Sequence, residues 1–181
     1  MDDLAQLAEL IRKRNALERQ ITALIGRPAQ IGHIGEYIAS RVFRIALEES
    51  ASHKSNDGRF SEGPLKERTV DIKWYALREG LLDITPDSLP DYYLVLAGPK
   101  SAATTSRGQT RPWTIDNVFI FEASALVAEL QAGDVKIGLA TSVRQHLWAK
   151  AEIYPAPSNA AFPLTEEQRK GLRLFGSGAE D

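Results

Sequence analysis

Residues 56–75 read NDGRFSEGPLKERTVDIKWY, and this stretch decides the fold of the chain. Near its end, Val70, Ile72 and Trp74 alternate with polar residues, which is the pattern of a β-strand with one apolar and one polar face. Ahead of that strand, DGRF reads as a shorter strand, and Gly63-Pro64 marks a turn. The stretch therefore predicts a β-hairpin.

The position of the turn fixes which residues of the hairpin face one another. With the turn centred near Pro64, Asp57 faces Asp71 and Phe60 joins the apolar face, whereas a slip of one residue would reverse a face. Asp71 and Lys73 share the polar face about 6–7 Å apart along the strand. A carboxylate and an ammonium group at that spacing can surround one phosphate, with Asp57 as a second carboxylate. The alternative is a polar hairpin face that only meets water.

The preceding segment, residues 28–49, predicts a helix. Its apolar residues recur at helical spacing: Ile31, Ile34, Ile38, Val42 and Ile45. On the helical wheel Glu36 falls among Gly32, Phe43 and Leu47. A buried carboxylate costs several kcal/mol unless it is neutralised, paired with a cation or bound to a metal. We therefore expect a positive group at Glu36, with an edge position in water or an arginine partner as the alternatives. His33 lies on the polar side and is expected to be exposed.

The N-terminal segment predicts a helix of about three heptads that ends at Gly26 and Pro28. Its apolar residues follow one another at three- and four-residue offsets: Leu7, Leu10, Leu17, Ile21 and Leu24. Arg14 occupies one position of the same seam and would specify the register if two such helices paired. The helix either packs on its own domain or serves as a dimerisation arm that forms a homodimer.

The remaining chain predicts further strands and helices in mixed order. The expected strands are at residues 91–98, 113–123 and 135–142, and residues 151–155 close the domain. The expected helices are at 124–133 and 164–175, and residues 143–150 form either a short helix or an irregular connection. Ser124 is the expected cap of the first of these helices, and Gly133 lies beyond its end. This order predicts an α/β fold with a mixed β-sheet core flanked by helices. We expect an N-terminal arm at 1–25, a domain at 26–155 and a partly disordered C-terminal extension at 156–181.

The composition restricts the function classes without naming one. The 181 residues are 43% hydrophobic and 25% charged, which fits one globular domain. The formal net charge of −2 requires any nucleic-acid surface to be local. Because there is no cysteine, disulfides, thiolate zinc sites and cysteine nucleophiles are excluded. Neither a membrane span nor a signal peptide is expected, which indicates a cytoplasmic protein.

Two segments are candidates for contact with phosphate groups. Residues 98–114 combine many hydroxyl groups and Trp113 with three cations and no acid. The cations are Lys100, Arg107 and Arg111. Arg144 and Gln145 stand at an expected helix start, where phosphates bind readily. A solvated loop and simple helix capping remain the alternatives.

The order of Glu36, Asp57 and Asp71-Ile72-Lys73 on a helix and two strands resembles the PD-(D/E)XK nuclease superfamily, which has the restriction-endonuclease-like fold. The segments IGHIGEYIA, DGRF, VDIKWY, PDYYLVLAGP and AEIYP are similar to an uncharacterised bacterial branch over residues 26–155. The resemblance implies a four- or five-stranded mixed sheet and Mg²⁺-dependent phosphodiester cleavage. It further implies Asp57 and Asp71 as metal ligands and Lys73 as the catalytic lysine. Asn56 stands where the family motif has proline.

Three functional hypotheses follow from these observations. In the first, the chain is a DNA endonuclease of genome defence or DNA processing: Asp57 and Asp71 hold Mg²⁺ or Mn²⁺, Lys73 assists the attacking water, and Glu36 is a third acid. RNA stays open as a substrate. In the second, the chain is a catalytically inactive nuclease-like module that binds nucleic acid or a partner protein. The third is a purely structural domain.

Overall fold

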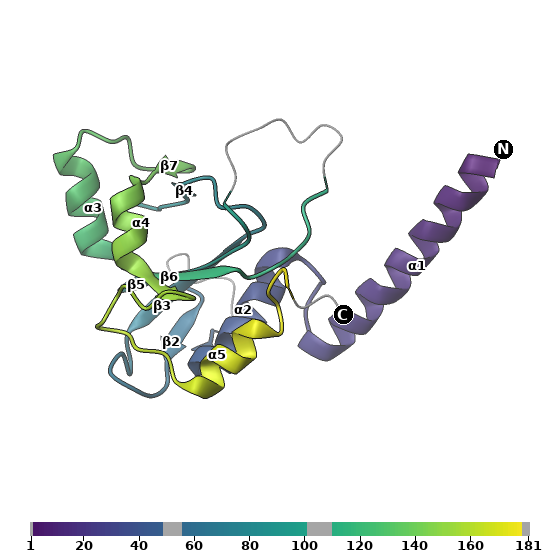
Figure 1. The fold of residues 1–181 in the computed structure, drawn as a ribbon, viewed down its shortest axis with the longest axis horizontal. Helices are drawn as coiled ribbons and strands as arrows, with labels where there is room; N and C mark the ends of the chain where they lie inside the picture. Colours follow the sequence, from purple (N-terminus) through teal and green to yellow (C-terminus); the bar gives the residue numbers. More distant parts are fainter. Residues whose placement is uncertain (1, 49–55, 101–109, 179–181) are drawn as a thin grey trace.

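The structure is a computed structural model that describes residues 2–48, 56–100 and 110–178. Over these residues the chain is mixed α/β, with helices packed around a β-sheet (Figure 1). In chain order the elements are α1 (Asp2–Ile25), α2 (Ile31–Phe43), β1 (Ile45–Leu47), β2 (Gly58–Phe60), β3 (Thr69–Tyr75), β4 (Leu81–Leu82), β5 (Tyr92–Ala97), β6 (Asn117–Glu122), α3 (Ala123–Ala132), β7 (Thr141–Ser142), α4 (Gln145–Ala151), β8 (Glu152–Tyr154) and α5 (Glu166–Arg173).

The main sheet is mixed, as the sequence predicted. Within the described residues its strand order is β1-β2-β3-β5-β6-β8, and β4 pairs with β7 in a separate two-stranded sheet. β3 and β5 are parallel, whereas the other neighbours in the main sheet are antiparallel. The hairpin register is confirmed, because Gly58 pairs with Val70 and Arg59 pairs with Thr69. Asp57, one residue before β2, is therefore level with Asp71.

Helices cover both faces of the main sheet. On one face, α2 and α5 pack over the apolar side of β3, where Phe60, Val70, Ile72 and Trp74 are buried. On the other face, α3 and α4 pack over β5 and β6, and Trp148 of α4 is 2% exposed. Because β5 is covered on both sides, most of its residues are apolar rather than alternating. The two cores hold β3 rigidly, and only one side of β3 carries polar groups.

The predicted helix over residues 28–49 is too long. It ends at Phe43, because Arg44 adopts a left-handed conformation with φ 53°. Residues Ile45–Leu47 then form β1, which pairs with β2. Ile45 is buried, but as a strand residue rather than on the helix face. The periodicity therefore identified the buried side chain correctly and its secondary structure wrongly.

Two smaller expectations also need correction. The strand expected over 135–142 is confined to Thr141–Ser142, which pair with β4 outside the main sheet. Ser124 lies inside α3, and the residue at the cap position is Glu122, with no side-chain capping bond. Ser124 instead donates a hydrogen bond to Glu122 at 3.2 Å. In both places the local sequence is compatible with more than one conformation, and packing against the surrounding strands selects the one that forms.

Helix α1 contains no buried residue and extends away from the rest of the chain (Figure 1). It ends at Gly26, whose φ of 74° favours glycine. A few residues of α1, including Ile21 and Ile25 in its last turns, are partly covered. The predicted arm is thus present as a projecting helix.

The C-terminal segment contributes to the core. Thr165 caps α5 through a reciprocal capping box with Gln168. Leu172 is 0% exposed and packs in the core beneath α2. Residues 179–181 of the expected C-terminal extension lie outside the described residues. Across the part of the chain that is described, no helix is long and apolar enough to cross a membrane.

Candidate active site

The candidate site lies on the polar side of β3. Asp71, Lys73 and Tyr75 alternate with the buried apolar residues of the strand. Lys73 Nζ lies 2.7 Å from Asp71 Oδ1, and the two side chains are 28% and 19% exposed. A half-buried ion pair of this kind keeps the ammonium and carboxylate groups together at one point of the sheet. The predicted D-x-K pair is therefore a physical pair in the structure.

Asp57 is held beside this pair by the backbone of β3. Its amide donates to the carbonyl of Val70 at 2.9 Å. In return, Asp57 Oδ2 accepts a hydrogen bond from the amide of Ile72 at 2.6 Å. The Asp57 carboxyl group thereby lies within hydrogen-bonding reach of Asp71. The structure brings together Asp57, Asp71 and Lys73, as the hairpin register predicted.

The electrostatics of Asp71 show that its negative charge is poorly compensated. Burial raises the pKa of Asp71 to about 6, against an ordinary value of 3.8. The ammonium group of Lys73 works in the opposite direction, while the neighbouring Asp57 raises the pKa further. One lysine therefore does not balance two carboxylates in a partly dry site. A bound cation would relieve the remaining repulsion.

Glu36 reaches the edge of the same site but has a different partner. Its side chain is 15% exposed and forms an ion pair with Arg27. Burial raises the pKa of Glu36, the nearby Asp57 raises it further, and the contact with Arg27 opposes both. The alternative of an arginine partner for Glu36 is thus the one found, and the arginine comes from the α1–α2 connection. The sequence pattern gave no signal for Arg27, because it lies outside the helix that carries Glu36.

The donor set of the site fits Mg²⁺ as a two-carboxylate site. No cluster of three or more His, Cys, Asp or Glu side chains that could hold a metal is found in residues 2–48, 56–100 and 110–178. Glu36 is engaged by Arg27 instead of completing such a cluster. Mg²⁺ is commonly held by one or two carboxylates together with water and substrate phosphates. The adjacent carboxylates of Asp57 and Asp71, with the raised pKa of Asp71, match that requirement.

His33 lies at the start of α2, on the same helix as Glu36. Its Nδ1 lies 3.0 Å from the carbonyl oxygen of Pro28, and the side chain is partly exposed to solvent. A ring nitrogen held by a backbone carbonyl is fixed at the start of α2. The charge of His33 also acts on the nearby Glu36, where it lowers the pKa of the carboxyl group.

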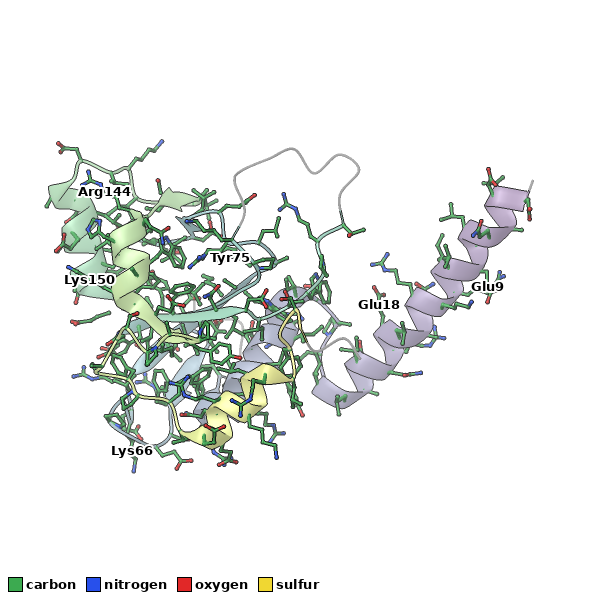
Figure 2. All side chains as sticks on the ribbon, viewed as in Figure 1. Glu9, Glu18, Lys66, Tyr75, Arg144 and Lys150 are labelled. Carbon is green, nitrogen blue, oxygen red and sulfur yellow. The ribbon has the colours of Figure 1, made fainter. Side chains whose placement is uncertain are left out.

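Two aromatic hydroxyl groups border the carboxylates. The phenol of Tyr75 accepts a hydrogen bond from the amide of Asp83 at 3.0 Å (Tyr75 is labelled in Figure 2). Burial and the charge of Asp71 raise the pKa of Tyr93 to about 12. Burial likewise raises the pKa of Tyr75 above its ordinary value. Both tyrosines stay neutral near pH 7 and add no negative charge to the site.

Arg78 is a cation of this face that sequence reasoning missed. Its guanidinium carbon lies 5.3 Å from the centre of the Phe119 ring. Phe119 pairs with Val95, and Val95 pairs with Lys73, so these side chains share one face of the sheet. Arg78 therefore folds back over the face that carries the Asp71–Lys73 pair. The sequence signal that could have identified Arg78 is its position shortly after the D-x-K strand.

Of the predicted cationic loop, the structure describes residues 98–100 and 110–114. Lys100 forms a β-bridge with Arg78 and is exposed. Arg111 is 37% exposed and lies 3.7 Å from Glu79. Arg107 lies outside the described residues. Lys100 and Arg111 are thus near the end of β3 that follows Tyr75.

Trp113 belongs to the opposite face of the sheet. Its ring lies 6.3 Å from the ring of Trp74, which is buried in the α2-side core. Since Trp74 and Lys73 are neighbours on a strand, their side chains point to opposite faces. Trp113 is therefore not placed to stack on a substrate held at Lys73.

The second predicted phosphate-binding pair, Arg144 and Gln145, is not brought to Asp71 and Lys73. Gln145 begins α4, and Arg144 is its cap residue without a side-chain capping bond. A side-chain carbon at Gly133 would lie 3.1 Å from Arg144 Nη2, which places the guanidinium against the end of α3. Figure 2 shows Arg144 at the α3–α4 end, apart from Tyr75. A cation beside a helix C-terminus is a stabilising arrangement.

Asp91 has a structural position next to the site strand. Its Oδ2 accepts hydrogen bonds from the amide and the hydroxyl of Thr69 at 2.8 and 2.9 Å. Although burial works against it, hydrogen bonds from Thr69 and the charge of Arg68 lower the pKa of Asp91. Asp91 therefore ties the start of β5 to the start of β3.

Comparison with known proteins finds no family model that matches the chain and no curated protein that is significantly similar to it.

Proposed function

We propose that the chain is a metal-dependent endonuclease that hydrolyses phosphodiester bonds of DNA, with a restriction-endonuclease-like arrangement of its site. The observation that carries the proposal is the convergence of Asp57, Asp71 and Lys73. The carboxylate of Asp57, just before β2, lies beside that of Asp71 on β3, and an ammonium group lies 2.7 Å from the second. Hard oxygen ligands beside a fixed cation are what phosphoryl transfer requires.

In this proposal each residue has a separate task. Asp57 and Asp71 would hold Mg²⁺ or Mn²⁺, which supplies a Lewis acid for the phosphate and lowers the pKa of a bound water. Lys73 holds its ammonium group where negative charge develops on the phosphate. The backbone amide of Ile72 keeps Asp57 in position. Glu36, paired with Arg27, keeps the neighbouring edge of the site charged and ordered.

The substrate surface would begin at the polar face of β3. Arg78 and Lys100 lie beyond the end of the strand and offer cations for the neighbouring phosphates. DNA is the proposed partner on that surface, within genome defence or DNA processing. We further propose that two copies associate through α1, so that two sites serve the two strands of a duplex.

The test is cleavage of plasmid DNA by the purified chain with Mg²⁺ or Mn²⁺. We expect nicking or linearisation by the wild type and at least a hundredfold loss in Lys73→Ala, since one positioned group is typically worth that factor or more. Lys66→Ala is the matched control, because Lys66 is exposed in the hairpin turn far from Tyr75 (Figure 2). Full activity of Lys73→Ala would refute the assignment.

One observation, the ion pair between Glu36 and Arg27, favours a second function. A site with only two carboxylates and a lysine is also compatible with a catalytically inactive nuclease-like module. Such a module would bind nucleic acid or a partner protein through the same face. Mobility-shift binding without cleavage of DNA or RNA, and no stabilisation by Mg²⁺ or Mn²⁺, would favour it over the nuclease.

A further inference from the structure

Helix α1 carries a continuous apolar surface that the described residues leave uncovered. Six large apolar side chains on it are between 48% and 72% exposed: Leu4, Leu7, Leu10, Ile11, Leu17 and Leu24. Its 24 residues include none that is buried. Helices gain most of their stability from packing of an apolar face, so a long helix in this state lacks a partner.

This apolar surface, the apolar stripe of α1, continues into a groove at the base of the helix. Ile21, Leu24 and Ile25 line one wall of a cavity of about 910 Å³, and residues of α2 and the C-terminal segment line the others. Trp113 and Leu174 of these walls are 47% and 71% exposed. The groove is therefore open and apolar at the point where α1 joins the domain. An occupant of the stripe that reaches this point would enter the groove.

The charges of α1 are separated along its length. The outer end carries only acids, which are Asp2, Asp3 and Glu9. The stretch nearer the domain carries the cations Arg12, Lys13, Arg14 and Arg19, with Glu18 as its single acid. Figure 2 shows Glu9 toward the free end of the helix and Glu18 closer to the domain. A parallel copy would place each of these acids beside its own copy, whereas an antiparallel copy separates them and opposes the helix dipoles favourably.

We propose that the apolar stripe of α1 is covered by α1 of a second copy running antiparallel, whose N-terminal end enters the groove. This deepens the association through α1 stated above. Arg14, which forms an ion pair with Glu18 of its own helix at 2.8 Å, then also lies opposite the partner subunit's Glu18. In the same register, the partner subunit's Leu7 lies level with Ile25, and its Leu4 enters the groove beside Leu174.

This register makes a geometric prediction. Pairing Arg14 with the partner subunit's Glu18 places the twofold axis level with residue 16. The two copies of Ala16 are then level, while the two copies of Ala5 are offset by about 22 residues, or about 33 Å along the axis. Packed helices lie about 8–10 Å apart, and both alanines are on the outward side of α1, away from Leu7 and Arg14. In a parallel pair, both positions would be level.

The test uses the absence of cysteine in the chain. Ala5→Cys and Ala16→Cys are spin-labelled separately in the full chain, and distances between copies are measured by pulsed electron paramagnetic resonance without DNA or metal. We expect about 35–40 Å for the label at position 5 and about 20 Å for the label at position 16. Two short distances would establish a parallel pair and overturn the proposal.

The mass of the particle is the second measurement. Light scattering is expected to give a dimer of the 20.0-kDa chain, and Leu7→Asp with Ile11→Asp is expected to raise the dimer dissociation constant by at least a hundredfold. Ala5→Asp with Ala16→Asp adds the same charge on the outward side and should leave the dimer intact. A monomeric wild type, or a dimer that tolerates the seam variant, would overturn the proposal. These readouts need no catalysis, so an inactive nuclease leaves them unchanged.

Discussion

Replacement of Asp71 by asparagine is predicted to stabilise the metal-free protein at neutral and alkaline pH. The reason is the cost of keeping a charged carboxylate beside Asp57 in a site where the Asp71 side chain is 19% exposed. The pKa of Asp71 is raised from 3.8 to about 6. Each pKa unit corresponds to about 1.4 kcal/mol, so the charged form costs about 3 kcal/mol of stability above pH 6.

The sign follows from proton binding. Because the folded state holds the Asp71 proton more tightly than the unfolded state, the free energy of unfolding falls as pH rises from about 4 to about 6. Asparagine has no charge to lose, so its advantage is complete above that window and vanishes below it. It also gives up the ion pair with Lys73. The expected net gain at pH 8 is therefore about 1–3 kcal/mol, or about 2–4 °C in Tm for each kcal/mol.

The assay is urea unfolding of wild type and Asp71→Asn in EDTA at pH 8 and pH 4. Asp91→Asn is the matched control, because its pKa is lowered by Thr69 and the substitution is expected to destabilise the protein at pH 8. Addition of Mg²⁺ should stabilise the wild type and leave Asp71→Asn unchanged, since only the wild type keeps both carboxylates. Equal or lower stability of Asp71→Asn at pH 8 would refute the electrostatic reasoning.

Three further predictions concern the surrounding structure. Arg27→Met should destabilise the chain by about 1–3 kcal/mol by leaving Glu36 unpaired, and adding Glu36→Gln should recover most of the loss in a double-mutant cycle of thermal unfolding. Thr165→Ala removes the capping box of α5 and should cost about 0.5–2 kcal/mol in urea unfolding; no change would mean that the cap is not formed in solution. Gly58→Ala places a carbon 2.4 Å from the carbonyl oxygen of Ala46, so it should open the β1–β2 pairing and speed hydrogen exchange there, whereas unchanged exchange would contradict that contact.

The sequence placed the candidate site better than it placed the ends of the elements. The alternation around Val70 and Trp74 fixed the two faces of β3, and the turn near Pro64 fixed the register that sets Asp57 beside Asp71. Both depend on residues close together in the chain, where periodicity and turn chemistry act directly. The existence and the end of helix α1 were likewise evident from its local spacing and from Gly26, whereas its projection from the domain was one of two alternatives.

What the sequence by itself determined is therefore the local order: which residues form the hairpin, which face of it is polar and where the N-terminal helix ends. The tertiary structure alone decided that Arg27 neutralises Glu36, that Arg44 ends α2 so that Ile45 enters the sheet, and that Arg144 lies against α3. These outcomes depend on contacts between segments distant in the chain. Several local choices are close in free energy, and the packing of the whole core selects among them.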